Sequence, residues 1–231
     1  QKVIDYLKDR PYAPNHKWSD AVNFWNSLYS DKNAIFDEVI EIDSSQIYPS
    51  VSWGLSPEQS IAINDSIPNI NEITNPDKKE ELKSSLIYMG LESGQSLMHL
   101  PIDAAFIGSC TNARLDDLRS AAKILKGNKV SPDVLAICTP ASADIKRNAE
   151  REGIDQIFKD SGFQWREPGC SLCFYAGGEG FLPKQRVITS TNRNFRGRQG
   201  PAVRSHLASP ATVAASAIAG KIIPSIEVCK K

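Results

Sequence analysis

Three cysteines are the residues of this 231-residue chain whose types and spacing could do chemistry. Cys170 and Cys173 form a C-x-x-C pair, which lets two thiolates hold one metal centre from a tight turn, and Gly169 gives the backbone freedom just before it. Cys110 lies far upstream, just past a predicted strand and at a predicted helix start, where the helix dipole favours a thiolate. The pattern predicts a metal or redox site.

Spacing alone leaves three kinds of site open. A structural zinc site would need a fourth protein ligand. A redox pair would use the C-x-x-C alone, without a third partner. A cubane iron–sulfur cluster held by three thiolates would keep one iron free to act as a Lewis acid. Of the other two cysteines, Cys138 lies in an apolar strand and is predicted to be a core residue, and Cys229 lies in a predicted tail.

An arginine-rich loop over residues 192–198 is the second candidate site. It carries Arg193, Arg196 and Arg198 around one glycine, and no acidic residue occurs between Gly180 and Glu227. Arginine binds carboxylates through paired hydrogen bonds. A solvated basic turn would have the same composition, but the local excess of positive charge favours a di- or tricarboxylate ligand.

The elements that must position these residues alternate from about residue 101 onward. We expect short buried strands and amphipathic helices in turn, which predicts a parallel sheet in an α/β layer fold. The strands are predicted at 104–107, 134–138 and 186–189, and the helices at 113–125, 143–152, 154–160 and 209–220. Ligands of such sheets bind beyond the carboxyl ends of the strands. The segments 106–112, 167–173 and 188–198 are therefore expected at one edge of the sheet.

The first hundred residues are less regular. We expect an entry or linking region over residues 1–100, followed by the α/β domain with the cysteines over residues 101–231. Within the first region, helices are predicted at 17–30 and 76–89, strands at 36–42 and 51–53, and a loop at 54–75.

Composition excludes several classes of partner. The 27 basic and 27 acidic residues cancel, so no nucleic-acid or anionic-membrane footprint is expected. No apolar run approaches the length of a membrane span, and charges interrupt the first ten residues where a signal peptide would be apolar. Five unevenly spaced cysteines do not resemble a secreted disulfide scaffold. We therefore expect a cytoplasmic protein.

The sequence motifs around these residues resemble those of a known family. Residues 106–114 (FIGSCTNAR), 168–173 (PGCSLC) and 189–198 (TSTNRNFRGR) together resemble the signatures of the aconitase superfamily. Further segments look like one branch, the large subunits of 3-isopropylmalate dehydratase. These segments are residues 10–14, the helix with Trp18, and residues 36–43, 51–54, 198–200 and 206–210. The resemblance runs over nearly the whole chain.

The resemblance implies a fold, a cofactor and a reaction. The fold would be an aconitase-type three-layer α/β/α domain with a mainly parallel sheet. Cys110, Cys170 and Cys173 would hold a [4Fe–4S] cluster. Asn192 and Arg193 would be catalytic, and Arg193 with Arg198 would bind substrate carboxylates. The reaction would interconvert 2-isopropylmalate and 3-isopropylmalate in leucine biosynthesis, by removing and re-adding water.

Two departures from the branch leave the substrate open. Phe174 begins a segment that differs from the usual Met-Asn text after the third cysteine, and Arg196 stands where the family often has Glu or Thr. A relative acting on citraconate, dimethylmalate or homocitrate would have the same cluster ligands. A non-catalytic metal-binding module and a zinc-stabilised domain are the alternatives outside enzymes.

The resemblance also implies partners. The family's large subunit is considerably longer, and its other half supplies catalytic histidines, whereas His16, His99 and His206 match no such motif. The family's general base is a serine on a swivelling domain, which in this branch is a separate small subunit. We therefore expect a small-subunit partner, and we expect this chain alone to be inactive.

Overall fold

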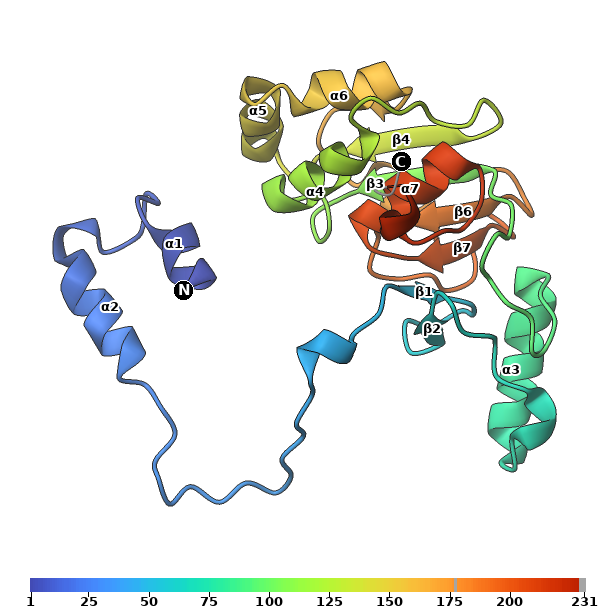
Figure 1. Ribbon diagram of the computed structural model, residues 1–231, viewed down its shortest axis with the longest axis horizontal. Helices are drawn as coiled ribbons and strands as arrows, with labels where there is room; N and C mark the ends of the chain where they lie inside the picture. The colour runs from blue at the N-terminus through green and yellow to red at the C-terminus, as the bar shows by residue number, and fades with distance from the viewer. Residues whose placement is uncertain (177, 229–231) are drawn as a thin grey trace. The chain divides into compact units, whose positions relative to one another are not determined.

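The computed structural model describes residues 1–176 and 178–228, and Cys229 lies outside them. The chain divides into two compact units, one over residues 1–46 and one from residue 47 onward (Figure 1). The organisation into residues 1–100 and 101–231 stays a prediction.

The first unit contains two short helices, α1 (Lys2–Leu7) and α2 (Trp18–Asn26), and two 3-10 turns, Asn15–Lys17 and Ser44–Gln46. In α2, Trp18 and Trp25 lie two turns apart on one face, with ring centroids 5.6 Å apart in an edge-to-face arrangement. The predicted helix is confirmed but ends earlier than expected, at Asn26.

The strand predicted at residues 36–42 is wrong. The segment has no strand pairing, and its apolar side chains are exposed, including Phe36, Val39 and Ile40. A strand needs a neighbour to bond its backbone groups, and the described part of this unit offers none. The alternating pattern of the sequence is thus present without the partner that would make it a strand.

The second unit is built on a five-stranded, all-parallel sheet with the order β5-β4-β3-β6-β7. Its strands are β3 (Ala104–Gly108), β4 (Leu135–Thr139), β5 (Gln164–Trp165), β6 (Arg186–Thr189) and β7 (Arg204–Leu207). The central strand β3 sets the register, because Ala104 lies opposite Leu135 on one side and Val187 on the other. The three predicted strands are confirmed. The sequence analysis missed β5 and β7, which are short and rich in polar residues.

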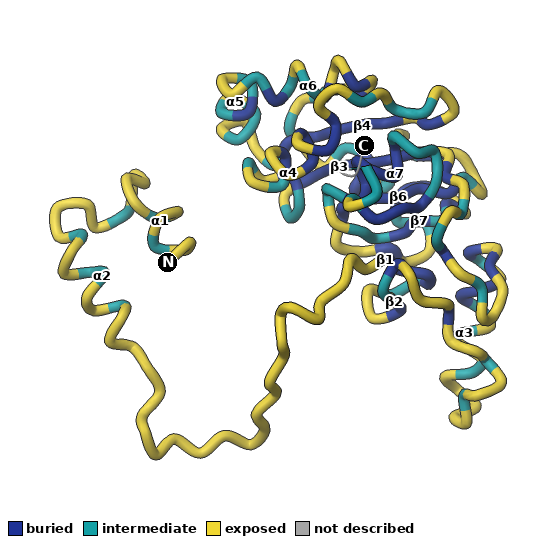
Figure 2. Tube along the Cα trace, viewed as in Figure 1, coloured by how far each residue is buried: buried dark blue, intermediate teal, exposed yellow. Residues whose placement is uncertain are grey.

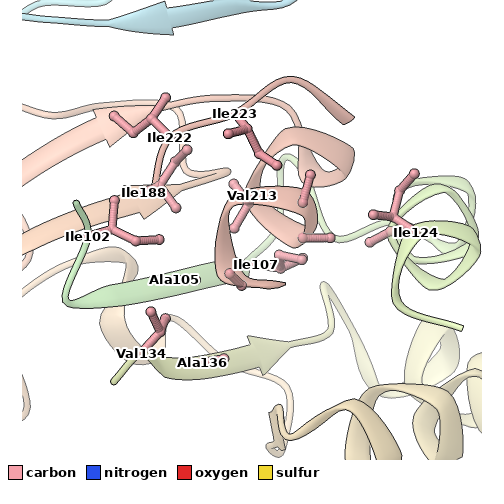
Figure 3. Packing of buried hydrophobic residues seen from close by; sticks show 14 of the residues in the cluster. Ile102, Ala105, Ile107, Ile124, Val134, Ala136, Ile188, Val213, Ile222 and Ile223 are labelled. Atoms are coloured by element: carbon pink, nitrogen blue, oxygen red, sulfur yellow. The ribbon is translucent and has the colours of Figure 1, made fainter. Parts of the chain in front are cut away.

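Helices cover one face of this sheet. They are α4 (Leu115–Leu125), α5 (Ala143–Arg151), α6 (Ile154–Ser161) and α7 (Pro210–Ala219). Ser209 caps α7, its Oγ accepting from the Thr212 amide at 3.2 Å, and Pro210 occupies the first turn as predicted. The inward face of α7 packs on β3, where Val213 and Ile107 belong to one buried cluster (Figure 3). Burying a large side chain of this kind stabilises the fold by about 1.5–3 kcal/mol.

The opposite face of the sheet is covered by a loop. Side chains alternate along β3, so that Ala105 and Ile107 face the helices while Ala104 and Phe106 face away from them. The outward set is buried against residues of the following loops, Leu172, Cys173, Phe181 and Val203. The buried stretches of the strands are visible in Figure 2. The expected α/β fold around a parallel sheet is confirmed, with the C-x-x-C turn itself covering this second face.

Residues 47–100 add a small hairpin and a helix to the same unit. The hairpin pairs β1 (Ser50–Ser52) with β2 (Ser60–Ala62). Strand β2 therefore interrupts residues 54–75, which were predicted as a loop. A 3-10 turn (Ile70–Glu72) precedes α3 (Pro76–Met89). This helix begins at the cap Asn75 and ends at Gly90, whose φ of 59° is the left-handed conformation that glycine adopts without strain. The predicted helix is confirmed at both ends.

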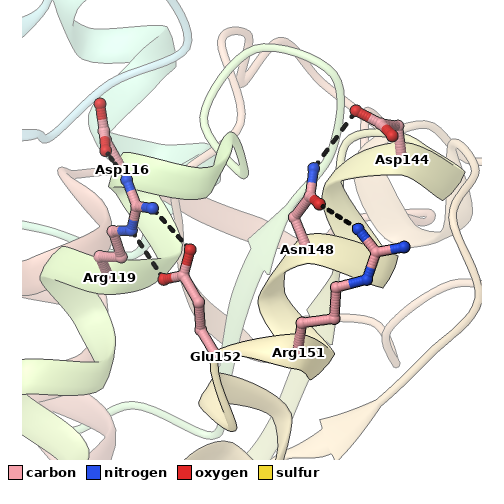
Figure 4. A network of polar contacts seen from close by, with 6 residues as sticks. All are labelled: Asp116, Arg119, Asp144, Asn148, Arg151 and Glu152. Atoms are coloured by element: carbon pink, nitrogen blue, oxygen red, sulfur yellow. Dashed lines mark hydrogen bonds and ion pairs between the residues drawn. The ribbon is translucent and has the colours of Figure 1, made fainter.

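A polar network joins α4 to the end of α5 (Figure 4). Arg119 donates from Nε and Nη2 to the two carboxylate oxygens of Glu152, at 2.8 and 2.6 Å, and from Nη1 to Asp116 at 2.7 Å. These two acidic neighbours raise the pKa of Arg119. Within α5, Asn148 donates to Asp144 and accepts from Arg151.

In the described part of the chain, no helix combines the length and the apolar character that a membrane span requires.

Candidate functional site

The candidate site lies where the parallel strands end. Strands β3, β5 and β6 run in one direction, so the segments that follow them leave from the same edge of the sheet. Cys110 follows β3, Cys170 and Cys173 follow β5, and the arginine loop follows β6. The sheet therefore places all three sequence segments at its carboxyl edge, where α/β folds bind ligands.

Ser190 ties the cysteine loop after β3 to the loop after β6. This fully buried serine accepts from the Gly108 amide at 3.2 Å, and its Oγ lies 3.1 Å from the carbonyl oxygens of both Gly108 and Asn112. Asn112 returns a bond from Nδ2 to the Ser190 carbonyl at 2.6 Å. The backbone on either side of Cys110 is thus fixed, while the Cys110 residue itself is exposed.

The C-x-x-C turn is a 3-10 turn (Ser171–Cys173) that packs on β3. Cys173 is buried and Cys170 is exposed. Gln199 links this turn to β7. Its Nε2 donates to the Leu172 carbonyl at 2.8 Å, and its Oε1 accepts from Ser205 at 2.7 Å. The turn is therefore bonded to the end of the arginine loop.

Arg198 is the arginine that reaches the cysteines. Its Nη2 lies 3.4 Å from Sγ of Cys173. Its guanidinium carbon lies 5.0 Å from the ring centroid of Phe174 and 5.3 Å from that of Phe195, both within cation–π range. The Nε atom of Arg198 is buried and has no hydrogen-bond partner among the described residues. A buried donor without an acceptor is costly, so this atom is suited to an anionic ligand.

The other two arginines of the loop take separate partners. Arg196 bonds Ser84 on α3, and its guanidinium carbon lies 5.4 Å from the centre of the Tyr88 ring. Arg193 is exposed and donates from Nη1 to the neighbouring Asn192 carbonyl, at 3.0 Å. The sequence suggested one cluster of three guanidinium groups, but Arg196 is engaged with α3.

A hollow of about 480 Å³ lies between the arginine loop and the loop after β1. It is lined by Arg193, Asn194, Phe195 and the four residues Leu55, Ser56, Pro57 and Glu58. Asn192 next to it is exposed. The lining combines one guanidinium group, one carboxylate and an apolar wall, which suits a small acid with an aliphatic part.

Asn194 and His206 anchor the wall of this hollow to the sheet through Ser52. Asn194 donates from Nδ2 to Ser52 Oγ at 3.1 Å and to the Gly54 carbonyl at 2.6 Å, and its buried Oδ1 has no partner among the described residues. His206, on β7, donates from Nδ1 to the Ser52 carbonyl at 2.7 Å. These bonds hold β1 and the loop that follows it against β7.

His206 is fully buried and neutral. Its Nε2 accepts from Arg186 at 2.8 Å, and burial together with the nearby Arg186 charge lowers the pKa of His206 to about 3. Burial, with a contribution from Arg204, also lowers the pKa of Arg186 to about 10, so Arg186 stays charged at neutral pH. Its two bonds, to Arg186 and to the Ser52 carbonyl, give His206 a structural role in joining β7 to β6 and β1.

Cys138 is a core residue, as predicted. It is fully buried on β4 and faces the helices, whereas Cys173 packs on the opposite face of the sheet. Burial raises the pKa of the Cys138 thiol. Cys138 therefore does not join Cys173 as a fourth zinc ligand.

The arrangement of the side chains bears on what kind of metal site the cysteines could form. Within residues 1–176 and 178–228, no three His, Cys, Asp or Glu side chains converge closely enough to hold a single metal ion. A cubane cluster makes a different demand, because each thiolate binds a different iron and the sulfurs stand further apart. Cys110, Cys170 and Cys173 are free thiols on the loops that follow β3 and β5 at one edge of the sheet.

Comparison with known proteins agrees with the fold and the motifs. The model of the aconitase family (aconitate hydratase) matches residues 1–220. The chain therefore belongs to the aconitase family.

Its relatives carry a more particular name. A protein of Cupriavidus necator called 3-isopropylmalate dehydratase large subunit is 54% identical over 221 residues, covering 95% of this chain and 83% of the relative. Proteins of the same subunit name from Prochlorococcus marinus and Bradyrhizobium diazoefficiens are 49% and 47% identical over 96% of this chain. The chain spans about half the length of these last two relatives, 48% and 47%.

The sequence did not identify the buried residues whose hydrogen bonds hold the cysteine loops in place. Ser190 and Gln199 are buried polar side chains whose partners lie in other segments, so no local pattern identifies them. The sequence did single out Phe174, because the segment that begins there differs from the sequence that the resemblance leads one to expect after the third cysteine. Its contact with Arg198 needed the tertiary structure.

Proposed function

We propose that this chain is the cluster-bearing part of a hydro-lyase that interconverts 2-isopropylmalate and 3-isopropylmalate. The proposal rests above all on one contact, the guanidinium of Arg198 beside the sulfur of Cys173. This contact brings a carboxylate-binding side chain to a thiol that suits a cluster. The names of the relatives, which are large subunits of that enzyme, support the same reaction.

Cys110, Cys170 and Cys173 would hold a [4Fe–4S] cluster. When bound, a cluster with three protein thiolates supplies one iron without a protein ligand, which acts as a Lewis acid toward a substrate hydroxyl and carboxylate. The chain supports this set of donors because the Cys110 loop is fixed by Ser190 and the C-x-x-C turn by Gln199. Rigid support of this kind orients metal ligands.

The arginine loop would bind and orient the substrate. Arg198 offers its unpartnered Nε to a carboxylate, and the exposed Arg193 offers a second guanidinium group at the edge of the hollow. Asn192 lies between Arg193 and the segment bonded to the Cys110 loop, a position that suits a contact with the reacting part of the substrate. We assign the general base to a small-subunit partner, as the family resemblance implies.

The lining of the hollow favours a branched aliphatic dicarboxylate over a tricarboxylate. Leu55, Pro57 and Phe195 provide apolar surface for an alkyl branch. Glu58 adds a carboxylate at the same hollow, which would repel a third carboxylate of the substrate. This supports isopropylmalate, and also dimethylmalate, ahead of homocitrate.

Metal and sulfide analysis of anaerobically prepared protein tests the cofactor. We expect about four irons and four sulfides per chain with a broad visible charge-transfer band. One zinc per chain and no sulfide, even after anaerobic reconstitution with iron and sulfide, would contradict the cluster and support a structural zinc domain.

Turnover tests the substrate. The cluster-loaded chain, within the full-length large subunit and with the small subunit added, should dehydrate isopropylmalate faster than homocitrate or dimethylmalate, and faster than it hydrates citraconate. The isolated chain should be inactive. If the complete enzyme prefers homocitrate, the assignment of the hollow is wrong although the cluster assignment stands.

A further inference from the structure

Two aromatic rings hold Arg198 against the third cysteine. We propose that Phe174 and Phe195 are positioning residues that clamp the Arg198 guanidinium, so that this one side chain sets both the environment of the Cys173 thiolate and the place of the substrate carboxylate. The inference rests on the proposed function, because it assumes that Cys173 binds the cluster.

The geometry points to a clamp. The guanidinium carbon lies 5.0 Å from the Phe174 centroid and 5.3 Å from the Phe195 centroid, and Nη2 lies 3.4 Å from Cys173 Sγ. The two rings come from the two loops that the site joins, one directly after the C-x-x-C turn and one inside the arginine loop. The backbone adds a further link, since the Tyr175 amide donates to the Arg198 carbonyl at 2.8 Å. Three contacts therefore converge on a side chain that would otherwise have many rotamers.

Among the described residues, Arg198 has no acidic partner, so its position depends on the rings of Phe174 and Phe195. In the described structure, Arg198 has no ion pair, and its buried Nε has no hydrogen-bond acceptor. The charge is therefore available to an anion, and the aromatic faces stabilise it without neutralising it. An acidic partner would also have held the guanidinium group, but it would have competed with the substrate carboxylate.

The clamp should act on the cluster as well as on the substrate. A cationic donor next to a thiolate ligand stabilises the more negative, reduced state of a cluster and so raises its reduction potential. It also withdraws charge from the sulfur and excludes water from that side of the cluster. If Arg198 swings away, the potential should fall and iron should be released faster.

Phe174 is the better of the two residues to test. Phe195 also lines the hollow, so its replacement would change substrate contacts directly, whereas Phe174 is not part of that lining. Phe174 is about half exposed (45%), so a change there does not open a core cavity. Met is apolar and flexible, so Phe174→Met removes the aromatic face while keeping an apolar side chain of similar reach.

The experiment compares Phe174→Met with Phe174→Tyr in the anaerobic, cluster-loaded enzyme with its small subunit. Tyr keeps the aromatic face and is the matched control. We measure the midpoint reduction potential, the rate of iron release to a chelator in air, and KM and kcat for isopropylmalate separately. For Phe174→Met we expect a lower potential, iron release about two- to fivefold faster and a KM higher by a similar factor, from the usual strength of one cation–π contact. Phe174→Tyr should match the parent in all three.

Two results would overturn the clamp. One is a Phe174→Met enzyme with unchanged potential, iron-release rate and KM, and the other is equal damage in Phe174→Met and Phe174→Tyr, which would indicate a packing role only. If Phe174→Met does not load iron, Phe195→Met provides the potential and iron-release readings. A parent protein that binds no iron, by contrast, refutes the proposed function and not the clamp alone.

Discussion

The guanidinium of Arg186 lies 2.8 Å from Nε2 of His206 in the interior of the second unit, where the histidine is fully buried. Arg186 also donates to the carbonyls of Met89 and Gly90 at the end of α3, at 3.1 and 3.4 Å. On its other side, His206 donates to Ser52 on β1. This pair therefore joins β6 and β7 to two elements from the first hundred residues.

This pair predicts loss of stability in mild acid. The pKa of His206 is about 3 in the folded chain, below the usual value of about 6.5 in an unfolded chain. The unfolded state therefore binds a proton first as the pH falls, and the stabilising effect present above about pH 6.5 is lost progressively toward pH 3. Denaturant titrations between pH 7 and pH 4 should show a decline of up to about 1.4 kcal/mol per pH unit from this group. His206→Asn should flatten this slope, whereas replacing the exposed His16 with Asn should not.

The buried Ser190 predicts a linked loss of stability and of iron. Ser190→Ala removes the hydroxyl that bonds Gly108 and Asn112, leaving buried backbone groups without a partner, at a cost of about 1–3 kcal/mol. Because these groups flank Cys110, the variant should also bind iron less firmly. Urea titration and iron analysis measure the two effects. Ser66→Ala, at an exposed serine, is the control, and an unchanged stability of Ser190→Ala would show that the hydroxyl does not hold the loop.

Replacing the cysteines one at a time should separate ligands from core residues. Cys110→Ser, Cys170→Ser and Cys173→Ser should each lose most of the bound iron and sulfide, because a cluster with only two protein thiolates is poorly held. Cys138→Ala should keep the full iron content and lose only about 1 kcal/mol of stability, since this thiol packs in the core beneath the helices. Iron lost from Cys138→Ala with retained folding would mean that the thiol is a ligand after all.

The ion pair between α4 and the end of α5 should contribute little. Arg119 bonds Glu152 through two nitrogens, but both side chains are substantially exposed, so solvent and salt screen the attraction. Arg119→Ala is expected to lower the free energy of unfolding by less than about 1 kcal/mol. Thermal unfolding at low and high salt measures this. A loss that is large and independent of salt would show that the pair is more than a surface contact.

The sequence by itself determined the regular elements and the candidate ligands. Short apolar runs such as that of β3 and β4, and the caps of α3 and α7, are local signals, and each of these elements forms where it was predicted. The Cys110 segment and the arginine loop also follow predicted strands, and parallel strands place the segments that follow them at one edge of the sheet. A local pattern and the topology of the sheet were sufficient for this much.

The tertiary structure decided which residues act together. It showed that Arg198 and not Arg196 reaches Cys173, that Cys138 faces away from the site, and that the C-x-x-C turn covers one face of the sheet. It also left residues 36–42 unpaired, although their pattern is that of a strand. The physical reason is the same in each case. Hydrogen bonds between distant segments, and the neighbours that a strand requires, depend on how the chain folds back on itself, and no local pattern of residues carries that information.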